Sequence, residues 1–288
     1  FWLIYMVSGS VSVSCLTAIF FGIHPMQVES VAWISERKNL LYAFFFLGAM
    51  ISYLYYLRKE KALKYYSFCL CLFILALLSK SMAITLPLVV LLLDYFTSRK
   101  INFSVFIEKI PYFFLSVLFG LIALFGSYLS KVFYIESAYG LLTKFMGASG
   151  DIIFYLNKLL LPVKLYPYSE IENNPFFLYS FVLVIILLAA VIISSRYTKK
   201  IILGSGLFLL TILPVLRFLP LDEVLVADRY IYLPAIGIFY LFAEGFIWWY
   251  RRRTGYYRFV RIFLAIVLAG IIIFLGCSTW KRSQVWKD

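Results

Sequence analysis

Most side chains that could do chemistry stand in three short polar breaks between long apolar runs. They are His24, Glu29, Arg37 and Lys38 in the first break, Lys80 in the second, and Asp222, Glu223, Asp228 and Arg229 in the third. A carboxylate can take the proton of an attacking hydroxyl group, and lysine and arginine can stabilise a departing phosphate. A membrane protein whose ionisable groups lie together on one side of the membrane is a candidate for chemistry on a lipid-borne or exported substrate.

The first break predicts a short helix that lies along the membrane surface. His24 stands near its cap position, and Glu29, Trp33 and the pair Glu36 and Arg37 then recur at the spacing of one helix face. Such a face combines a carboxylate, an aromatic ring and a cation. The alternative is an interfacial helix whose charges are solvated and whose tryptophan is anchored among lipid headgroups.

The third break places Asp228 and Tyr232 four residues apart, so both can face one cavity where a helix begins. Acidic residues in a first helical turn are also favoured by the helix dipole, which is the simpler explanation of Asp228. Arg229 is unfavourable to the same dipole, and its planar fork suits a phosphate. Lys80, in a tight turn between two short apolar runs, is either a phosphate ligand or a lysine that reaches up to the interface.

The elements that must position these breaks are membrane helices. The 288 residues are 64% hydrophobic and 14% charged, with a mean hydropathy of +0.93, whereas soluble domains carry about 25% charged residues. The sequence therefore predicts an all-α, polytopic helix bundle with about nine spans and one interfacial helix. The predicted spans are 2–22, 39–57, 65–79, 82–96, 110–130, 176–195, 201–220, 230–250 and 262–280, and the interfacial helix is 140–172.

The charges predict which way the bundle is oriented. Nine spans place fifteen lysines and arginines and two acidic residues in one set of loops, with the remaining twelve bases and ten acids on the other side. The basic side is cytoplasmic by the positive-inside rule, so the three polar breaks face outward. Asp94 and Glu244 lie near the inner ends of their spans, and we interpret both as partners of the bases close by.

Several function classes are disfavoured by the sequence. The net charge of +13 is interleaved with apolar spans, which fits contact with membrane lipids and argues against a nucleic-acid partner. One histidine and four dispersed cysteines predict neither a metal site nor a disulfide framework. No nucleophile constellation or nucleotide-binding loop occurs, so we expect no tightly bound cofactor. Gly204-Ser205-Gly206 is interpreted as a helix-packing feature.

Residues 21–39, which read FGIHPMQVESVAWISERKN, resemble a hallmark of one family. The family comprises the bacterial relatives of the transmembrane-and-tetratricopeptide-repeat O-mannosyltransferases, within the GT-C glycosyltransferase superfamily. Residues 78–95, 155–168 and 227–234 are similar to further family segments in the expected order, and 280–288 resemble the point where helical repeats begin.

The resemblance implies a GT-C-like membrane domain over residues 1–280, truncated at its N-terminus, with 281–288 starting a linker to repeats. It implies transfer of a sugar from a polyprenyl-phosphate donor to a hydroxyl acceptor, a protein serine or threonine, on the periplasmic face of a bacterial inner membrane. The catalytic acid is expected upstream of residue 1. The candidate substrate-binding residues are His24, Glu29, Trp33, Arg37, Lys38, Lys80, Asp228, Arg229 and Tyr232.

Two other functions fit the same residues. A protein that binds or flips lipid-linked sugars would use the same cations but would need no catalytic base. A membrane scaffold that only displays C-terminal repeats would need no polar cluster outside the membrane.

Overall fold

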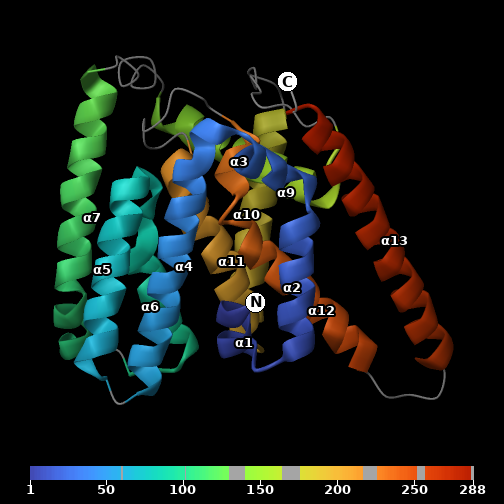
Figure 1. Ribbon diagram of the computed structural model, residues 1–288, viewed down its shortest axis with the longest axis horizontal. Coiled ribbons are helices and arrows are strands. Elements are labelled where there is room, and N and C mark those ends of the chain that lie inside the picture. Colours follow the sequence, from blue (N-terminus) through green and yellow to red (C-terminus); the bar gives the residue numbers. More distant parts are fainter. Residues whose placement is uncertain are drawn as a thin grey trace.

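The computed structural model describes residues 1–59, 61–100, 102–129, 140–163, 176–216, 226–251 and 257–286. All regular elements in these segments are helices, which confirms the all-α prediction for the part of the chain described (Figure 1). The α-helices are α1 (Trp2–Ser8), α2 (Val11–Ile23), α3 (Val28–Ala32), α4 (Arg37–Arg58), α5 (Leu63–Ser79), α6 (Leu86–Phe96), α7 (Phe103–Leu129), α9 (Leu141–Leu160), α10 (Phe176–Ser194), α11 (Lys199–Ile212), α12 (Ala235–Arg251) and α13 (Tyr257–Gln284). The 3₁₀ helices are η1 (Pro25–Gln27), η2 (Ile34–Glu36), η3 (Ser81–Thr85), η4 (Leu213–Val215) and η5 (Asp228–Ile231).

Several of these helices have the length and composition of membrane spans. Among the described residues, four helical segments qualify: Ile34–Arg58, Phe103–Leu129, Phe177–Ser194 and Phe259–Gln284. Val11–Ile23 and Pro25–Ala32 make a fifth if this pair, bent by 58°, is one span. The protein is thus an integral membrane protein, and the nine crossings read from the sequence stay a prediction.

The first predicted span, 2–22, is wrong as a single helix. Gly9 ends α1 in the left-handed region, with φ of 65°, and Ser10 caps α2 by accepting a hydrogen bond from the backbone N–H of Val13. Glycine adopts positive φ without the steric cost that a Cβ would add. The two helices pack against each other, and only α2 continues toward the first polar break.

The bundle is held by close helix pairs in its middle and flanked by two apolar helices (Figure 1). Gly204 on α11 meets Gly237 on α12 so closely that a Cβ added to Gly237 would lie 2.2 Å from the Gly204 carbonyl oxygen. This contact confirms the packing role predicted for the Gly204-Ser205-Gly206 stretch. At the two edges, α7 and α13 expose most of their apolar surface, as expected of helices that face lipid.

Helix α9 corresponds to the amphipathic helix predicted within 140–172. Residues 164–172 lie outside the described part of the chain. Its buried face carries Ala148, Ile152, Tyr155 and Leu159, which follow one another at helical spacing. It has 20 residues but is not apolar enough to be counted among the candidate spans. In Figure 1, α9 lies at the same end of the bundle as α3.

Both acidic residues near the inner ends of their spans are paired, Asp94 with a base close by in the chain, as predicted, and Glu244 with a lysine of another helix. Asp94 binds Arg99 at 3.3 Å and Lys109 at 3.1 Å, and Glu244 binds Lys200 at 2.8 Å. These pairs compensate the charge of carboxylates that would otherwise be costly to bury in an apolar bundle.

The C-terminal helix α13 runs to Gln284, past the predicted end of the last span at residue 280. The first residues of the predicted linker, 281–284, therefore continue the helix. This extension carries Arg282 to the end of the bundle where the polar breaks lie.

Candidate functional site

The first polar break is not the single surface helix that its residue spacing predicts. It consists of η1, α3 and η2, and Arg37 already belongs to the long helix α4. The extended backbone of His24 and Trp33 interrupts the helical path on either side of α3. These interruptions turn Glu29 and Glu36 into the protein, whereas Arg37 stays exposed.

Arg229 occupies the centre of the site. Its Nη1 lies 3.0 Å from Oε1 of Glu29, which is 200 residues away in the chain, and its Nε lies 3.5 Å from Oε1 of Glu36. Its guanidinium carbon lies 5.5 Å from the ring centre of Trp33 and 5.1 Å from that of Tyr230. The guanidinium is therefore held by two carboxylates and two aromatic faces, and the side chain is mostly buried.

Asn39 connects the three breaks. Its Nδ2 donates to the backbone carbonyl of Arg229 and to Oγ of Ser30, both at 2.9 Å, and its Oδ1 accepts a hydrogen bond of 3.1 Å from Lys80 Nζ. Lys80 Nζ also lies 4.0 Å from Oε2 of Glu36. The sequence analysis did not select Asn39; the signal that could have found it is an amide in the first turn of an otherwise apolar helix.

Among the described residues, four buried side-chain atoms of the first break have no hydrogen-bond partner. They are Oε2 of Glu29, Oε2 of Glu36 and both side-chain amide atoms of Gln27. Buried polar groups in proteins are nearly always hydrogen-bonded, so unsatisfied ones call for an explanation such as a ligand or an ordered water. In the part of the chain described, no group of three histidine, cysteine, aspartate or glutamate residues is arranged to hold a metal ion.

Asp228 adds a carboxyl group whose protonation changes near neutral pH. Burial and the negative charge of Glu29 raise the pKa of Asp228 to about 7, although Arg282 and Lys158 act in the opposite direction. Arg282 Nη2, from α13, lies 3.4 Å from Asp228 Oδ2. Asp228 can thus exchange a proton under physiological conditions.

His24 is bound into the scaffold. The backbone N–H of Met26 donates to its Nδ1 at 3.3 Å, so its Nε2 carries the proton and donates to the carbonyl of Leu159 at 3.2 Å. Burial lowers the pKa of His24 to about 4. The neutral ring therefore joins the start of η1 to the end of α9.

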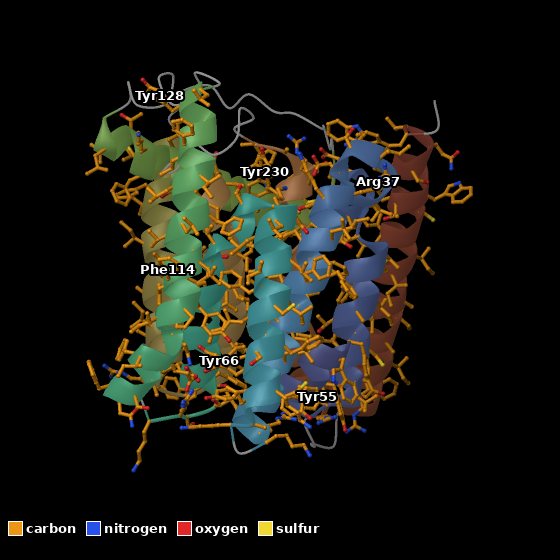
Figure 2. All side chains as sticks on the ribbon, turned by 60° about the vertical axis from the view of Figure 1, so that its left-hand side comes forward. Arg37, Tyr55, Tyr66, Phe114, Tyr128 and Tyr230 are labelled. Atoms are coloured by element: carbon orange, nitrogen blue, oxygen red, sulfur yellow. The ribbon has the colours of Figure 1, made fainter. Side chains whose placement is uncertain are left out.

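The remaining predicted site residues lie at the edge. Arg37 donates to the Ile34 carbonyl at 3.2 Å, and Lys38, which is 57% exposed, lies 3.9 Å from Glu36. Tyr232 packs edge-on against the ring of Phe21. Figure 2 shows Arg37 and Tyr230 at the same end of the bundle, with Tyr55 and Tyr66 at the other. Asp222 and Glu223 lie outside the described residues.

The structure thus brings Glu29, Lys80 and Arg229 together and leaves Arg37 outside the group. Trp33 and Asp228 belong to the same site through Arg229 and Glu29. Glu36 and Asn39 complete the cluster of Glu29, Glu36, Asn39, Lys80 and Arg229, which we call the ionic cluster. Its two acidic and two basic residues balance in charge.

Comparison with known proteins gives one partial similarity. No protein-family model matches the chain, and no solved structure matches it. A segment of 95 residues, 33% of the chain, is 32% identical to the protein O-mannosyl-transferase Tmtc1 of Drosophila melanogaster. The segment covers 11% of that relative's length. This chain is thus similar, over a third of its length, to a glycosyltransferase.

Proposed function

We propose that this chain is the membrane part of a GT-C glycosyltransferase that moves a sugar from a polyprenyl-phosphate donor to a hydroxyl acceptor, a protein serine or threonine. The observation that carries the proposal is the ionic cluster, in which Arg229 and Lys80 lie beside carboxylates at one end of an apolar helix bundle. The partial similarity to an O-mannosyl-transferase supports it. Phosphate is the ligand that such a pair of cations suits best.

The carboxylates hold both cations in position. When a donor phosphate enters, Arg229 exchanges its contact with Glu29 for two parallel hydrogen bonds to phosphate oxygens, and Lys80 adds a third contact. In the transfer step the acceptor oxygen bonds to the anomeric carbon, and the bond from that carbon to the phosphate oxygen breaks. The cations then stabilise the negative charge that develops on the leaving polyprenyl phosphate.

The acceptor hydroxyl must also lose its proton. We propose that a carboxylate takes this proton. Asp228 and Glu29 are placed to orient hydroxyl groups of the sugar or acceptor, since the raised pKa of Asp228 lets it donate or accept a hydrogen bond near neutral pH. The polyprenyl chain would lie along apolar helix surfaces, and the reaction would take place on the periplasmic side of a bacterial inner membrane.

The test is Arg229→Lys, made in the protein as its gene encodes it. Lysine keeps the charge but cannot form the bidentate contact, so we expect sugar transfer to fall by roughly 30- to 1,000-fold, equivalent to about 2–4 kcal/mol. Transfer is measured in membranes from a polyprenyl-phosphate sugar, with protein amounts matched. Arg37→Lys is the control, because it makes the same change at an exposed arginine in the same part of the fold.

Near-normal transfer by the Arg229→Lys protein would contradict the phosphate role. If the wild-type protein binds the donor and transfers no sugar to any hydroxyl acceptor, the lipid-linked-sugar binding or flipping function replaces the transferase.

A further inference from the structure

A cavity lies at the opposite end of the bundle from the ionic cluster. Its volume is about 340 Å³, and its lining includes Ser8, Ser10, Lys200, Glu244, Trp248 and Arg251. These residues come from the end of α1, the start of α2, the start of α11 and the end of α12. Helix α12 starts just after η5 and has 17 residues, so it separates the cavity from the ionic cluster by about 25 Å.

The cavity has a surplus of positive charge. Lys200 is neutralised by Glu244 at 2.8 Å. Arg251 Nη2 contacts only the hydroxyl of Ser10, at 3.4 Å, and forms no ion pair within the residues that the structure describes. The planar guanidinium of Arg251 therefore has donors left for an anion, beside a serine hydroxyl that can supply another.

The residues around the cavity are those expected at the level of the lipid headgroups. Trp248 and Trp249, next to Arg251, are 55% and 52% exposed, and tryptophan favours the boundary between headgroups and acyl chains. The cavity wall continues into the apolar side chains of Val13 and Ile247. Polar donors on one side and apolar walls on the other suit a molecule with a phosphate head and a hydrocarbon body.

We propose that this cavity binds the phosphate of one anionic phospholipid. Arg251 and the hydroxyl of Ser10 hold the phosphate oxygens, and Val13 and Ile247 contact the glycerol and upper acyl chains. The positive charge selects an anionic headgroup over a choline headgroup, whose own cation would be repelled by Lys200 and Arg251. The site is independent of the proposed sugar transfer, because none of its residues belongs to the ionic cluster.

The experiment is native mass spectrometry of the purified protein after incubation with phosphatidylglycerol, with phosphatidylcholine, or with phosphatidylglycerol plus inorganic phosphate. We expect one tightly retained phosphatidylglycerol and much weaker retention of phosphatidylcholine. The double variant Lys200→Gln/Arg251→Gln should lower phosphatidylglycerol retention by about tenfold or more. The control variant Lys64→Gln/Arg196→Gln removes two exposed bases that do not line the cavity and should retain the lipid.

Equal retention of the two lipids by the wild-type protein would overturn the proposal without recourse to any variant, so a misfolded variant cannot obscure the result. Equal loss in the double variant and its control would show diffuse attraction to the membrane and would also overturn it. Displacement of the lipid by millimolar inorganic phosphate would identify a soluble anion as the ligand and would exclude the lipid.

Discussion

Asn39 is the residue on which the geometry of the ionic cluster depends. One neutral side chain binds the backbone of Arg229, the hydroxyl of Ser30 and the ammonium of Lys80, so it sets the relative positions of three segments. An amide is suited to this task because it donates and accepts at once and adds no charge to a balanced group.

Asn39→Ala should therefore destabilise the fold and reduce sugar transfer together. It leaves the buried carbonyl of Arg229 and the buried hydroxyl of Ser30 without their donor, and each loss costs about 1–3 kcal/mol of folding free energy. Thermal unfolding in detergent and the transfer assay give the two measurements. Asn102→Ala is the control: it removes an exposed amide that accepts a hydrogen bond from Val105 N–H at the start of α7, so it should lower the unfolding temperature and leave transfer unchanged. Wild-type activity of the Asn39→Ala protein would remove Asn39 from the positioning role.

Asp228 should make stability depend on pH. Its carboxyl has a pKa of about 7 in the folded protein and about 4 in an unfolded chain, so the folded state binds more protons between these values. Stability then falls as pH rises from about 4 to 7. The charged groups acting on Asp228 are Glu29, Arg282 and Lys158.

The measurement is the difference in unfolding temperature between wild type and Asp228→Asn at pH 4.5 and pH 7.5. The variant cannot ionise at this position, so the wild type should lose stability relative to it as pH rises. A difference that does not change with pH would show that Asp228 titrates outside this range.

At the scale of elements, the contact between α11 and α12 fixes the position of η5, the 3₁₀ helix that carries Arg229. Gly204 and Gly237 allow the two backbones to approach, and α12 begins four residues after η5 ends. A helix crossing this close tolerates no added side chain, because packed interiors leave few voids.

Gly237→Ala should lower stability by about 1–3 kcal/mol through overpacking, since its Cβ would meet the Gly204 oxygen. Gly245→Ala is the control on the same helix. A Cβ there meets nothing within 4 Å, and alanine favours helix, so this change should be neutral or stabilising. Unfolding temperatures in detergent decide the comparison, and equal effects of the two changes would argue against close packing at Gly237.

At the scale of the whole molecule, the bundle separates two kinds of polar end. The ionic cluster lies at the end that includes α3 and α9 (Figure 1). The charge pairs of Lys109 and Lys200 involve residues near the starts of α7 and α11. The excess of loop bases at the opposite end predicts that it is cytoplasmic.

Cysteine labelling tests this orientation. Cys15, Cys71 and Cys277 are exposed and are first replaced by serine. Ile34→Cys, at a position 72% exposed beside the ionic cluster, should react with an impermeant thiol reagent in intact cells. Tyr197→Cys, 86% exposed at the opposite end, should react only after the membrane is permeabilised. The reverse pattern would invert the topology.

The amino-acid sequence alone determined the all-helical membrane class and the pairing of Asp94 with a nearby base, whereas the partner of Glu244, Lys200, comes from another helix 44 residues away. The membrane class and the Asp94 pair depend on composition and on neighbours within a few helical turns, where hydropathy and charge act directly. It did not predict the break at Gly9, because a single glycine is compatible with either a continued helix or a turn.

Only the tertiary structure decided which charged residues meet. Glu29 and Arg229 are 200 residues apart, and no local pattern states which face of each helix turns inward. Helical spacing placed both Glu36 and Arg37 on the face of Glu29, but after the extended backbone at Trp33 only Glu36 reaches the cluster, and Arg37 begins α4. Packing determines the partner of a buried charge. Burying a charged side chain without a partner costs too much desolvation free energy, and only the folded chain brings the two charged groups within ion-pair distance.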